Sequence, residues 1–338
     1  MADKTNTKIA VIGTGSWGTA LAQVLADNGH APILYGIDPS EVCDINDCCR
    51  NSKYFGEVEL SSTIKATTDL AEAVSGAAAV VFAAPSKFVY QETCNFAPFL
   101  APNAIIVNTA KGFDREHGCR LSDAIRLSLS EVGREAPIAS LLGPSHAEEV
   151  IRRMKTSISV ASTDIKSAKI VQNLFSNDYL RIYVTDDEIG AEYGAAVKNV
   201  IAISAGIADG QGYGDNAKAA LVTRGLSEMM RYGCAKGANK DTFFGLSGLG
   251  DLVVTCFSPH SRNYRAGLEI GRADCAKQWL ESCQGTIEGV ESCRAIVHDL
   301  QQYDFEMPLV QSLYRVLFEN SPPSHEITTL LERKLRSE

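Results

Sequence analysis

Three glycines near the start of the chain have the spacing of a phosphate-binding turn. Gly13, Gly15 and Gly18 follow the apolar run Lys8–Ile12 and open a helix-like stretch at 16–28. The first glycine can make a tight turn, the second lets backbone N–H groups approach a pyrophosphate, and the third lets helix and strand pack closely. Because a helix N-terminus carries partial positive charge, this context predicts a dinucleotide cradle. The alternative is a tight helix–strand turn without a ligand.

A carboxylate follows at the distance that a ribose contact requires. The second apolar run, 33–37, ends in Asp38, twenty residues after Gly18. An acidic side chain there can accept hydrogen bonds from a ribose hydroxyl. A strand before the glycines, a helix after them and this carboxylate together are much more specific than the glycines alone.

A lysine stands inside an apolar helical stretch. Lys198 lies in AAVKNVI (195–201), and an ammonium among apolar neighbours costs free energy unless it is paired or its pKa falls. Since a lysine with a lowered pKa can pass a proton near neutrality, the position predicts a general acid or base. The alternatives are a snorkelling lysine or a structural ion pair with Glu192 or Asp187.

Two further charged residues have positions that suit catalysis. Lys111 follows the apolar run 104–110, at the place where the sheet should open onto the cofactor crevice, and Gly112 lets the backbone turn sharply behind it. The alternative is that Lys111 is a solvated charge on the surface. Asp251 ends the glycine-dense stretch GLSGLGD (245–251), where it can orient an ammonium or share its proton. The alternative is an aspartate that caps a helix starting at Leu252.

One short segment is the strongest candidate for a small-anion site. Ser261, Arg262 and Asn263 stand at the expected start of a helix, where free N–H groups, a hydroxyl, an amide and a guanidinium can together hold a phosphate. An arginine that simply points to solvent is the alternative. We interpret Ser145 and His146 as a turn and capping box that lead into a helix. For Glu288, a role at the start of a helix is as plausible as a role in a binding site.

The elements that must position these residues change character along the chain. Up to about residue 185, short apolar runs alternate with helical stretches, which predicts a parallel sheet covered by helices on both faces. The expected strands are 8–13, 31–37, 78–83, 104–108, 138–142, 157–161 and 181–184. Because ligands gather beyond the carboxyl ends of such strands, the loops after 78–83, 104–108 and 138–142 should face one crevice with the glycine turn.

Beyond Asp186 the pattern is helical. Stretch 188–208 is apolar on nearly every face, which predicts a helix inside a core. We interpret Gly206, Gly210, Gly212 and Gly214 as a glycine-rich connection to further helices at 217–233, 261–272, 289–303 and 309–318, with a last short helix after Pro322-Pro323. The length of 338 residues suits two domains, which we place at 1–187 (dinucleotide-binding) and 188–338 (helical, substrate-binding and catalytic).

Composition excludes several classes of function. A net charge of −9 disfavours nucleic acid and anionic membranes, so an anionic ligand must be held by a few local cations. The polar segment before the first strand and the lack of a long apolar run predict neither a secretory signal nor a membrane span, hence a cytoplasmic protein. The ten cysteines show no C-x-x-C spacing, so we expect no metal site and no redox pair.

In this order, the segments resemble the NAD(P)-dependent sn-glycerol-3-phosphate dehydrogenase family of the bacterial type. The matching stretches are GTGSWGTALA from Gly13, NTAKG from Asn108, GPSHAEEV from Gly143, AVKNVIAI from Ala196, GLGDLVVTC from Gly248, SRN from Ser261 and IEG from Ile287. They run from residue 9 to about residue 290, and the combination is far more specific than any one motif.

The resemblance implies a Rossmann-like domain followed by an all-helical domain, NAD or NADP as cofactor, and reversible oxidation of glycerol 3-phosphate to dihydroxyacetone phosphate. It further implies a homodimer that supplies glycerol 3-phosphate for phospholipid synthesis. Lys198 resembles the family's proton acceptor and donor at the C2 oxygen, with Lys111 and Asp251 orienting the substrate and that lysine. The other implied contacts are Ser261, Arg262 and Asn263 at the substrate phosphate, Gly143, Ser145 and Ala147 lining the cleft, and Ser16, Trp17, Lys111, Ala147, Arg262, Ile287 and Glu288 at the cofactor.

One position departs from the family. The family often carries His or Arg immediately before the Asp at the end of the second strand, where it can meet a 2′-phosphate, whereas this chain has Ile37. Asp38 would repel a phosphate but suits a free ribose hydroxyl, so the choice between NAD and NADP stays open.

Two other functions remain as alternatives. One is a β-hydroxyacid dehydrogenase of the 6-phosphogluconate type, which shares the domain plan and a lysine in a buried helix. The other is a regulatory protein that binds NAD(H) without turnover. The segment 261–263 together with Gly250 and Asp251 favours the glycerol-phosphate family.

Overall fold

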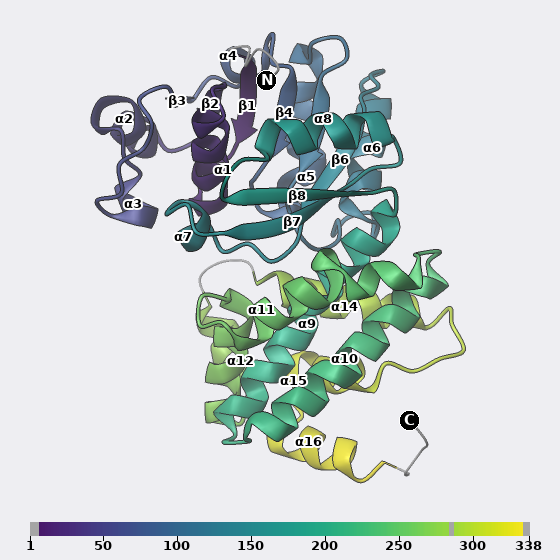
Figure 1. The fold of residues 1–338 in the computed structure, drawn as a ribbon. Helices are drawn as coiled ribbons and strands as arrows, with labels where there is room; N and C mark the ends of the chain where they lie inside the picture. Colours follow the sequence, from purple (N-terminus) through teal and green to yellow (C-terminus); the bar gives the residue numbers. More distant parts are fainter. Residues whose placement is uncertain (1–6, 284–286, 334–338) are drawn as a thin grey trace. The chain divides into compact units, whose positions relative to one another are not determined.

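The computed structural model describes residues 7–283 and 287–333 (Figure 1). The chain divides into two compact units, Met1–Ala191 and Glu192–Glu338, here called unit 1 and unit 2. The division falls inside one long helix, α9 (Glu188–Gly210). Unit 1 contains a sheet with helices around it, whereas the described part of unit 2 is helical. This confirms the predicted fold class.

The sheet of unit 1 has eight strands in the order β3-β2-β1-β4-β5-β6-β7-β8. The seven strands that the sequence predicts are all present, and the additional one, β3, has only three residues, too few to show a period. The strands are β1 (Lys8–Ile12), β2 (Ala31–Tyr35), β3 (Lys65–Thr67), β4 (Ala79–Phe82), β5 (Ile105–Asn108), β6 (Ile138–Leu142), β7 (Thr156–Ala161) and β8 (Leu180–Thr185).

The expectation of a wholly parallel sheet is wrong at one pair of strands. β7 runs antiparallel to β6, while every other neighbouring pair is parallel. The chain between β6 and β7 contains one four-residue helix, α7 (Ala147–Val150), which is only about 6 Å long. Such a helix cannot carry the chain back along the sheet, so the next strand runs in the opposite direction.

Strand β1 is buried on both faces. Ile9 and Val11 belong to a core that includes residues of α1 (Ser16–Asp27) and α8 (Ile165–Phe175), whereas Ala10 and Ile12 belong to a core on the other face. Because successive side chains of a strand point to opposite faces, both alternating sets must be apolar. The remaining helices of unit 1 are α2 (Pro39–Cys48), α3 (Ser52–Phe55), α4 (Leu70–Val74), η1 (Ser86–Phe88), α5 (Val89–Phe96), η2 (Ala97–Phe99) and α6 (Leu121–Glu131).

Helix α9 is the buried helix that the sequence predicts, and nearly all its residues in unit 2 are shielded from solvent. It packs against several shorter helices, to which glycines allow close approach. The other helices of unit 2 are α10 (Asp215–Ala235), η3 (Lys240–Phe244), η4 (Leu246–Gly250), α11 (Asp251–Phe257), α12 (Arg262–Ala273), α13 (Lys277–Ser282), α14 (Glu288–Leu300), α15 (Pro308–Phe318) and α16 (Pro323–Leu331).

Glycines bring α9 and α12 into backbone contact. A Cβ placed on Gly206 would lie 2.1 Å from the carbonyl oxygen of Tyr264, and a Cβ on Gly267 would lie 2.0 Å from the carbonyl oxygen of Ile203. Neither distance is compatible with a side chain. The two helices therefore approach each other as closely as backbones can, which fixes the start of α12 beside the helix that carries Lys198.

The predicted glycine-rich connection is therefore partly wrong. Gly206 and Gly210 lie within α9, and only Gly212 and Gly214 belong to the link between α9 and α10. The first pair is separated by four residues, which places both glycines on one face of a helix. They are glycines because of helix packing, whereas Gly212 has a φ of +80° and makes a turn.

Candidate active site

The predicted dinucleotide turn joins β1 to α1. Gly13 has a φ of +118°, and a Cβ on Gly18 would lie 2.1 Å from the Gly13 carbonyl oxygen, so neither position accepts a side chain. A Cβ on Gly15, in contrast, would meet no atom within 4 Å. Gly15 is also the N-cap of α1 and offers no side-chain acceptor to the first N–H groups of that helix. A pyrophosphate requires this combination of open space and unsatisfied donors.

Three predicted site residues meet in the loops after β5 and β6. Lys111 Nζ donates a hydrogen bond to the Gly143 carbonyl oxygen at 2.9 Å, and Ser145 Oγ donates to the same oxygen at 3.0 Å. Gly143 has a φ of +142°, and a Cβ there would lie 3.0 Å from Ile158 Cα. Since β1, β4, β5 and β6 are parallel neighbours, their carboxyl ends share the edge of the sheet that carries the glycine turn.

The capping box predicted at Ser145 and His146 does not form. His146 is the N-cap of α7 but makes no side-chain cap hydrogen bond, and Ser145 bonds back to Gly143 instead. Ala147, the first residue of α7, is buried. This short helix is held by its neighbours rather than by a polar cap, so Ser145 keeps its interpretation as a cleft residue.

Asp38 is the N-cap of α2 and lies beyond the end of β2. Its Oδ1 accepts hydrogen bonds from Ser40 N at 2.9 Å and from Ser40 Oγ at 2.6 Å. These bonds, with a smaller contribution from Lys53, lower the pKa of Asp38, so the side chain is a carboxylate at neutral pH. Its Oδ2 lies 3.8 Å from Lys53 Nζ. The residue thus caps a helix and also presents negative charge where the sequence predicts a ribose contact.

Lys198 is buried within unit 2, with 4% of the residue exposed. Its Nζ donates hydrogen bonds to Asp251 Oδ1 at 2.6 Å and to Thr255 Oγ1 at 2.8 Å. This burial contradicts the snorkelling alternative, and Asp251 is an acid that Lys198 bonds. Burying a charged pair is costly unless further hydrogen bonds complete it, and Thr255 supplies one.

Asp251 is the first residue of α11 rather than its cap. Its N-cap is Gly250, which closes the preceding π-helical turn η4 by donating from its N to the Gly245 carbonyl oxygen at 3.1 Å. Thr255, one turn later, donates to the Asp251 carbonyl oxygen at 2.5 Å while it accepts from Lys198. The capping alternative is wrong because the carboxylate bonds the lysine. Single-turn π segments of this kind are frequent at functional sites.

Sequence reasoning missed two residues of this cluster, Thr255 and Asn199. Thr255 lies four residues after Asp251, a spacing that places both on one face of a helix. Asn199 follows Lys198 directly, and its Oδ1 accepts a hydrogen bond from Asn263 Nδ2 at 3.0 Å. Both lie inside the stretches that match the family. The spacing of Thr255 from Asp251 and the position of Asn199 next to Lys198 could therefore have identified them from the sequence.

Asn263 connects three helices. Its Nδ2 bonds Asn199 of α9, and its Oδ1 accepts a hydrogen bond from Gly289 N of α14 at 2.9 Å. A Cβ on Gly289 would lie 2.5 Å from the Asn199 carbonyl oxygen, so α14 also approaches α9 through its backbone. An amide nitrogen carries two hydrogens, and one of them is used here. Asn263 therefore combines a structural role with the predicted phosphate contact.

The remaining predicted residues of unit 2 stand at the starts of α12 and α14. Ser261 is the N-cap of α12, and its Oγ accepts a hydrogen bond from Tyr264 N at 3.2 Å. Arg262, the first residue of α12, is exposed. Ile287 and Glu288 are the N-cap and first residue of α14. The bond between Asn263 and Gly289 joins these two helix starts beside α9.

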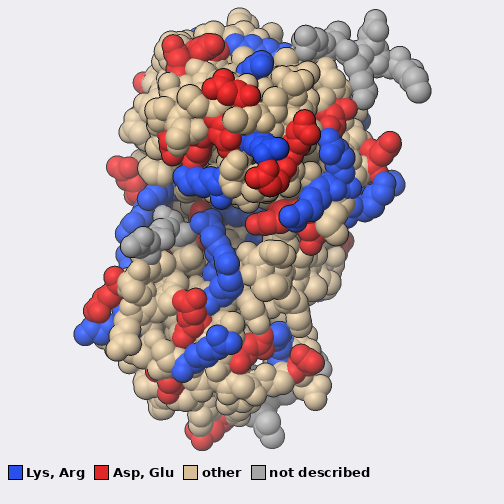
Figure 2. All heavy atoms as spheres, turned by 90° about the vertical axis from the view of Figure 1, so that its left-hand side faces the viewer, with Lys and Arg blue, Asp and Glu red and all other residues tan. Residues whose placement is uncertain are grey.

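The described residues also carry charged side chains, possible metal ligands and thiols. Acidic and basic side chains are interspersed on the face that Figure 2 shows. Among residues 7–283 and 287–333, no group of three or more His, Cys, Asp or Glu is placed to hold a metal ion, and no helix is long and apolar enough to cross a membrane. All ten cysteines are free, and burial raises the pKa of Cys256 to about 12, so that thiol stays neutral.

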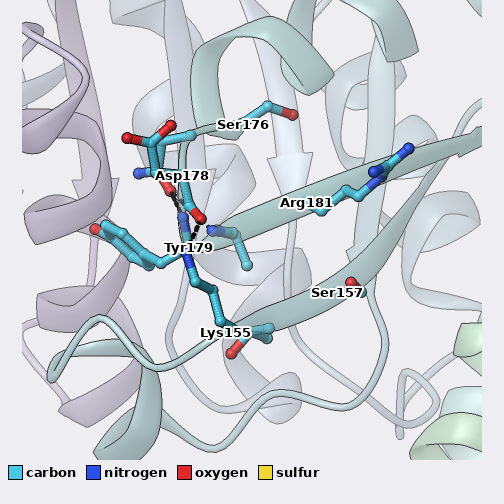
Figure 3. A pocket seen from close by; sticks show the side chains of 9 residues that line it. Lys155, Ser157, Ser176, Asp178, Tyr179 and Arg181 are labelled. Carbon is cyan, nitrogen blue, oxygen red and sulfur yellow. Dashed lines mark hydrogen bonds between the residues drawn. The ribbon is translucent and has the colours of Figure 1, made fainter.

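A hollow of about 450 Å³ lies in unit 1 at the starts of β7 and β8 (Figure 3). Its lining includes Lys155, Asp178, Tyr179 and Arg181 and contains none of the predicted site residues. Lys155 Nζ is occupied by a hydrogen bond to the Asp178 carbonyl oxygen at 2.5 Å. The chemistry described above is therefore not centred on this hollow.

Two family models match most of the chain. The model described as NAD-dependent glycerol-3-phosphate dehydrogenase N-terminus matches residues 8–168, and the C-terminus model matches residues 187–328. Glycerol-3-phosphate dehydrogenase (NAD(P)+) of Listeria innocua is 44% identical over 334 residues, which cover 99% of this chain and 98% of the relative. The same enzyme of Staphylococcus haemolyticus is 42% identical and covers 98% and 100%.

Solved structures agree with these matches. Glycerol-3-phosphate dehydrogenase from Coxiella burnetii has a TM-score of 0.89 at 34% identity, with 96% of this chain and 98% of that chain covered. A glycerol-3-phosphate dehydrogenase from Plasmodium falciparum, with a TM-score of 0.87 at 22% identity over 98% and 97%, shows the shared fold. On the two family models and the relatives above 40% identity, the chain belongs to the NAD-dependent glycerol-3-phosphate dehydrogenase family, as its motifs predict.

Proposed function

We propose that this protein interconverts sn-glycerol 3-phosphate and dihydroxyacetone phosphate with NAD(P)(H). The observation that carries the proposal is the buried Lys198 amine bonded to Asp251 and Thr255. A buried ion pair is a weak device for stability, because desolvation offsets much of the attraction. Such pairs are common where a proton must be held and released. Membership of the family supplies the reaction, and this geometry supplies a proton carrier.

The glycine turn fits the cofactor. Its open side at Gly15 and the unsatisfied start of α1 suit a pyrophosphate. When bound there, the nicotinamide would supply the hydride acceptor for oxidation of glycerol 3-phosphate and the hydride donor for reduction of dihydroxyacetone phosphate. We assign Ser16 and Trp17, the first residues of α1, to cofactor contact, and Ile287 and Glu288 of unit 2 to the same role.

Lys198 holds and moves the proton. During oxidation the neutral amine takes the proton of the C2 hydroxyl as the hydride leaves C2, and during reduction the ammonium returns it to the C2 oxygen. Asp251 and Thr255 fix the direction of the amine through bonds of 2.6 and 2.8 Å. Lys111 supplies positive charge that favours the developing alkoxide.

The start of α12 binds the substrate phosphate in this proposal. Arg262 can hold a phosphate with two parallel N–H bonds, and the first N–H groups of the helix add further donors. Asn263 contributes the amide hydrogen that its bond to Asn199 does not use. Ser261 and Asn263 are both buried, so the loop is already ordered for a ligand.

The test is a dihydroxyacetone phosphate-dependent loss of NADH or NADPH absorbance. Lys198→Ala should lower kcat by about 10²- to 10⁴-fold, because a positioned acid–base group contributes that much, while NADH binding measured by fluorescence titration survives. As a matched control, Lys236→Met removes another ion-paired lysine of unit 2, bonded to Asp299 Oδ2 at 2.6 Å, and should retain turnover.

Two outcomes would contradict the proposal. Substantial turnover by Lys198→Ala would remove the lysine from the chemistry. Wild-type protein that binds NADH but turns over with neither reduced cofactor would favour the NAD(H)-sensing alternative. The family matches already argue against the 6-phosphogluconate type.

We extend the proposal to a cytoplasmic homodimer that supplies glycerol 3-phosphate for phospholipid synthesis. This extension rests on family membership alone.

A further inference from the structure

A buried carboxylate that the proposed chemistry does not use lies beside the glycine turn. Glu41, in the first turn of α2, is 7% exposed. Its Oε2 accepts a hydrogen bond from Thr14 Oγ1 at 2.5 Å, and its Oε1 accepts one from Lys53 Nζ at 2.5 Å. Thr14 stands between the first two glycines of the turn. The acid is therefore fixed to the pyrophosphate cradle, and Lys53 of α3 is fixed to the acid.

This group lies at the carboxyl end of β2, where Rossmann-like folds contact the adenosine ribose. Gly13 N donates to the Tyr35 carbonyl oxygen at 2.8 Å, and a Cβ on Gly36 would lie 2.4 Å from Thr14 Cγ2. The end of β2 is therefore packed directly against the glycine turn. Figure 1 shows α2 and α3 beside the edge of the sheet that β3 and β2 form. The residues after Gly36 stand where a ribose and its 2′ substituent are expected.

The charge at this place is negative. Asp38 adds a second carboxylate, with Oδ2 3.8 Å from Lys53 Nζ, and its pKa is lowered mainly by hydrogen bonds from Ser40. The hydrogen bond to Glu41 raises the pKa of Lys53, so the ammonium is charged. Two carboxylates and one ammonium leave one net negative charge. Ile37 is 86% exposed and adds no charge.

We infer that Glu41 is a specificity-determining residue that makes this enzyme prefer NADH to NADPH by holding Lys53. A 2′-phosphate carries about −1.5 to −2 charges at neutral pH and needs a nearby cation that is not already neutralised. Lys53 is a cation at this position, but its ammonium is already paired with the Glu41 carboxylate. A free 2′-hydroxyl needs only an acceptor, which Asp38 supplies. The inference deepens the proposed function, on whose cofactor it rests.

Removing the charge of Glu41 should therefore shift the preference. In Glu41→Gln the two carboxylates become one, and the half-exposed Lys53 side chain becomes available to a 2′-phosphate. The ratio of Kd for NADPH to Kd for NADH, from fluorescence titration, should be at least about tenfold in the wild type and should fall by about tenfold in the variant. Adding Lys53→Met to Glu41→Gln should cancel the gain.

Two further variants keep the test decisive. Lys53→Met alone changes a half-exposed side chain and should raise the NADPH-to-NADH ratio further, because both carboxylates are then uncompensated. Glu57→Gln removes an exposed carboxylate paired with Arg50 and should leave the ratio unchanged. Circular dichroism establishes that each variant is folded.

Failure of this inference is distinguishable from failure of the proposed function. Wild-type protein that binds NADPH as tightly as NADH, or an unchanged ratio in folded Lys53→Met and Glu41→Gln, overturns the role of Glu41 but leaves a dehydrogenase. Wild-type protein that binds neither cofactor overturns the proposed function itself. Because the readout is binding, turnover is not needed to decide between these outcomes.

Discussion

Glu228 has a buried carboxyl group that accepts hydrogen bonds at the start of another helix. It lies on α10, and its Oε1 and Oε2 accept hydrogen bonds from Leu309 N at 2.8 Å and Val310 N at 3.2 Å in the first turn of α15. Burial raises the pKa of Glu228 to about 7, although the two N–H donors favour the anion. The folded protein therefore favours the protonated form more than the unfolded chain does.

The raised pKa predicts a stability that falls as pH rises. The contribution of Glu228 is fully present below the ordinary pKa of 4.5 and is lost as pH increases through about 7. The loss is at most about 3–4 kcal/mol, since one pKa unit corresponds to about 1.4 kcal/mol. Gln is uncharged at every pH, so the urea midpoint of the wild type should fall relative to that of Glu228→Gln from pH 5 to pH 8.

Glu326 provides the matched control with the opposite sign. Burial raises its pKa, but hydrogen bonds from Arg315 and Ser321 outweigh burial and lower the pKa below the ordinary value. Its contribution is lost only as pH falls through that lowered pKa. The difference in urea midpoint between the wild type and Glu326→Gln, here called the offset, should therefore stay constant between pH 5 and pH 8. A Glu228→Gln offset that is equally constant would contradict the assignment.

At the same scale, sequence reasoning identified residues better than it identified partners. An ammonium inside the apolar stretch around Lys198 required a reason, and the structure supplies Asp251. The resemblance implied that pair, whereas local spacing offered Glu192 or Asp187, because Lys198 and Asp251 lie on separate helices, α9 and α11. Thr255 was accessible from the i,i+4 spacing, whereas the connection of Asn263 to Gly289 depends on how three helices pack.

At the scale of elements, the backbone contact between α9 and α12 determines where the proposed phosphate loop stands relative to Lys198. Gly267 meets only backbone atoms, with the Ile203 carbonyl oxygen 2.0 Å and Ile207 N 3.0 Å from an added Cβ. Backbone atoms cannot move aside as a flexible side chain can. A larger residue at this position must push the two helices apart.

Gly267→Ala should therefore destabilise the protein by about 1–3 kcal/mol, the usual cost of overpacking a core. The added methyl group should also raise the KM for dihydroxyacetone phosphate, because Ser261 and Asn263 at the start of α12 move with it. The free energy of unfolding from urea titration and the KM are the measurements. Gly214→Ala, at a glycine with open space around it, should change both little. Equal stability of the two variants would show that the contact is looser than described.

Elements with a strong period were predicted and irregular ones were not. The apolar runs of β1, β4 and β5 are continuous because both faces of the sheet are covered, so composition alone marks them. β3 is too short to carry a pattern, and the direction of β7 depends on the length of α7 rather than on the strand itself. Gly206 and Gly210 were wrongly assigned to a loop because glycine is common both in loops and where two helices are in close contact.

At the scale of the whole molecule, one helix belongs to both units. Glu188 at the start of α9 is buried in unit 1, where Arg126 Nη2 donates to its Oε1 at 3.0 Å and to its Oε2 at 2.7 Å. The same helix continues into unit 2 and carries Lys198. A helix forms cooperatively, since each turn supports the next. Unfolding of either unit therefore removes part of the helix that the other requires.

A ligand of unit 1 should consequently stabilise both units. NADH at about 100 times its Kd adds about 2.7 kcal/mol, which raises the unfolding midpoint by several degrees. Trp279→Phe leaves Trp17 of unit 1 as the only tryptophan, so its fluorescence follows unit 1 while helical ellipticity follows both units. The two thermal transitions should coincide and should shift together with NADH. A fluorescence transition that shifts while part of the ellipticity transition stays in place would show that α9 does not couple the units.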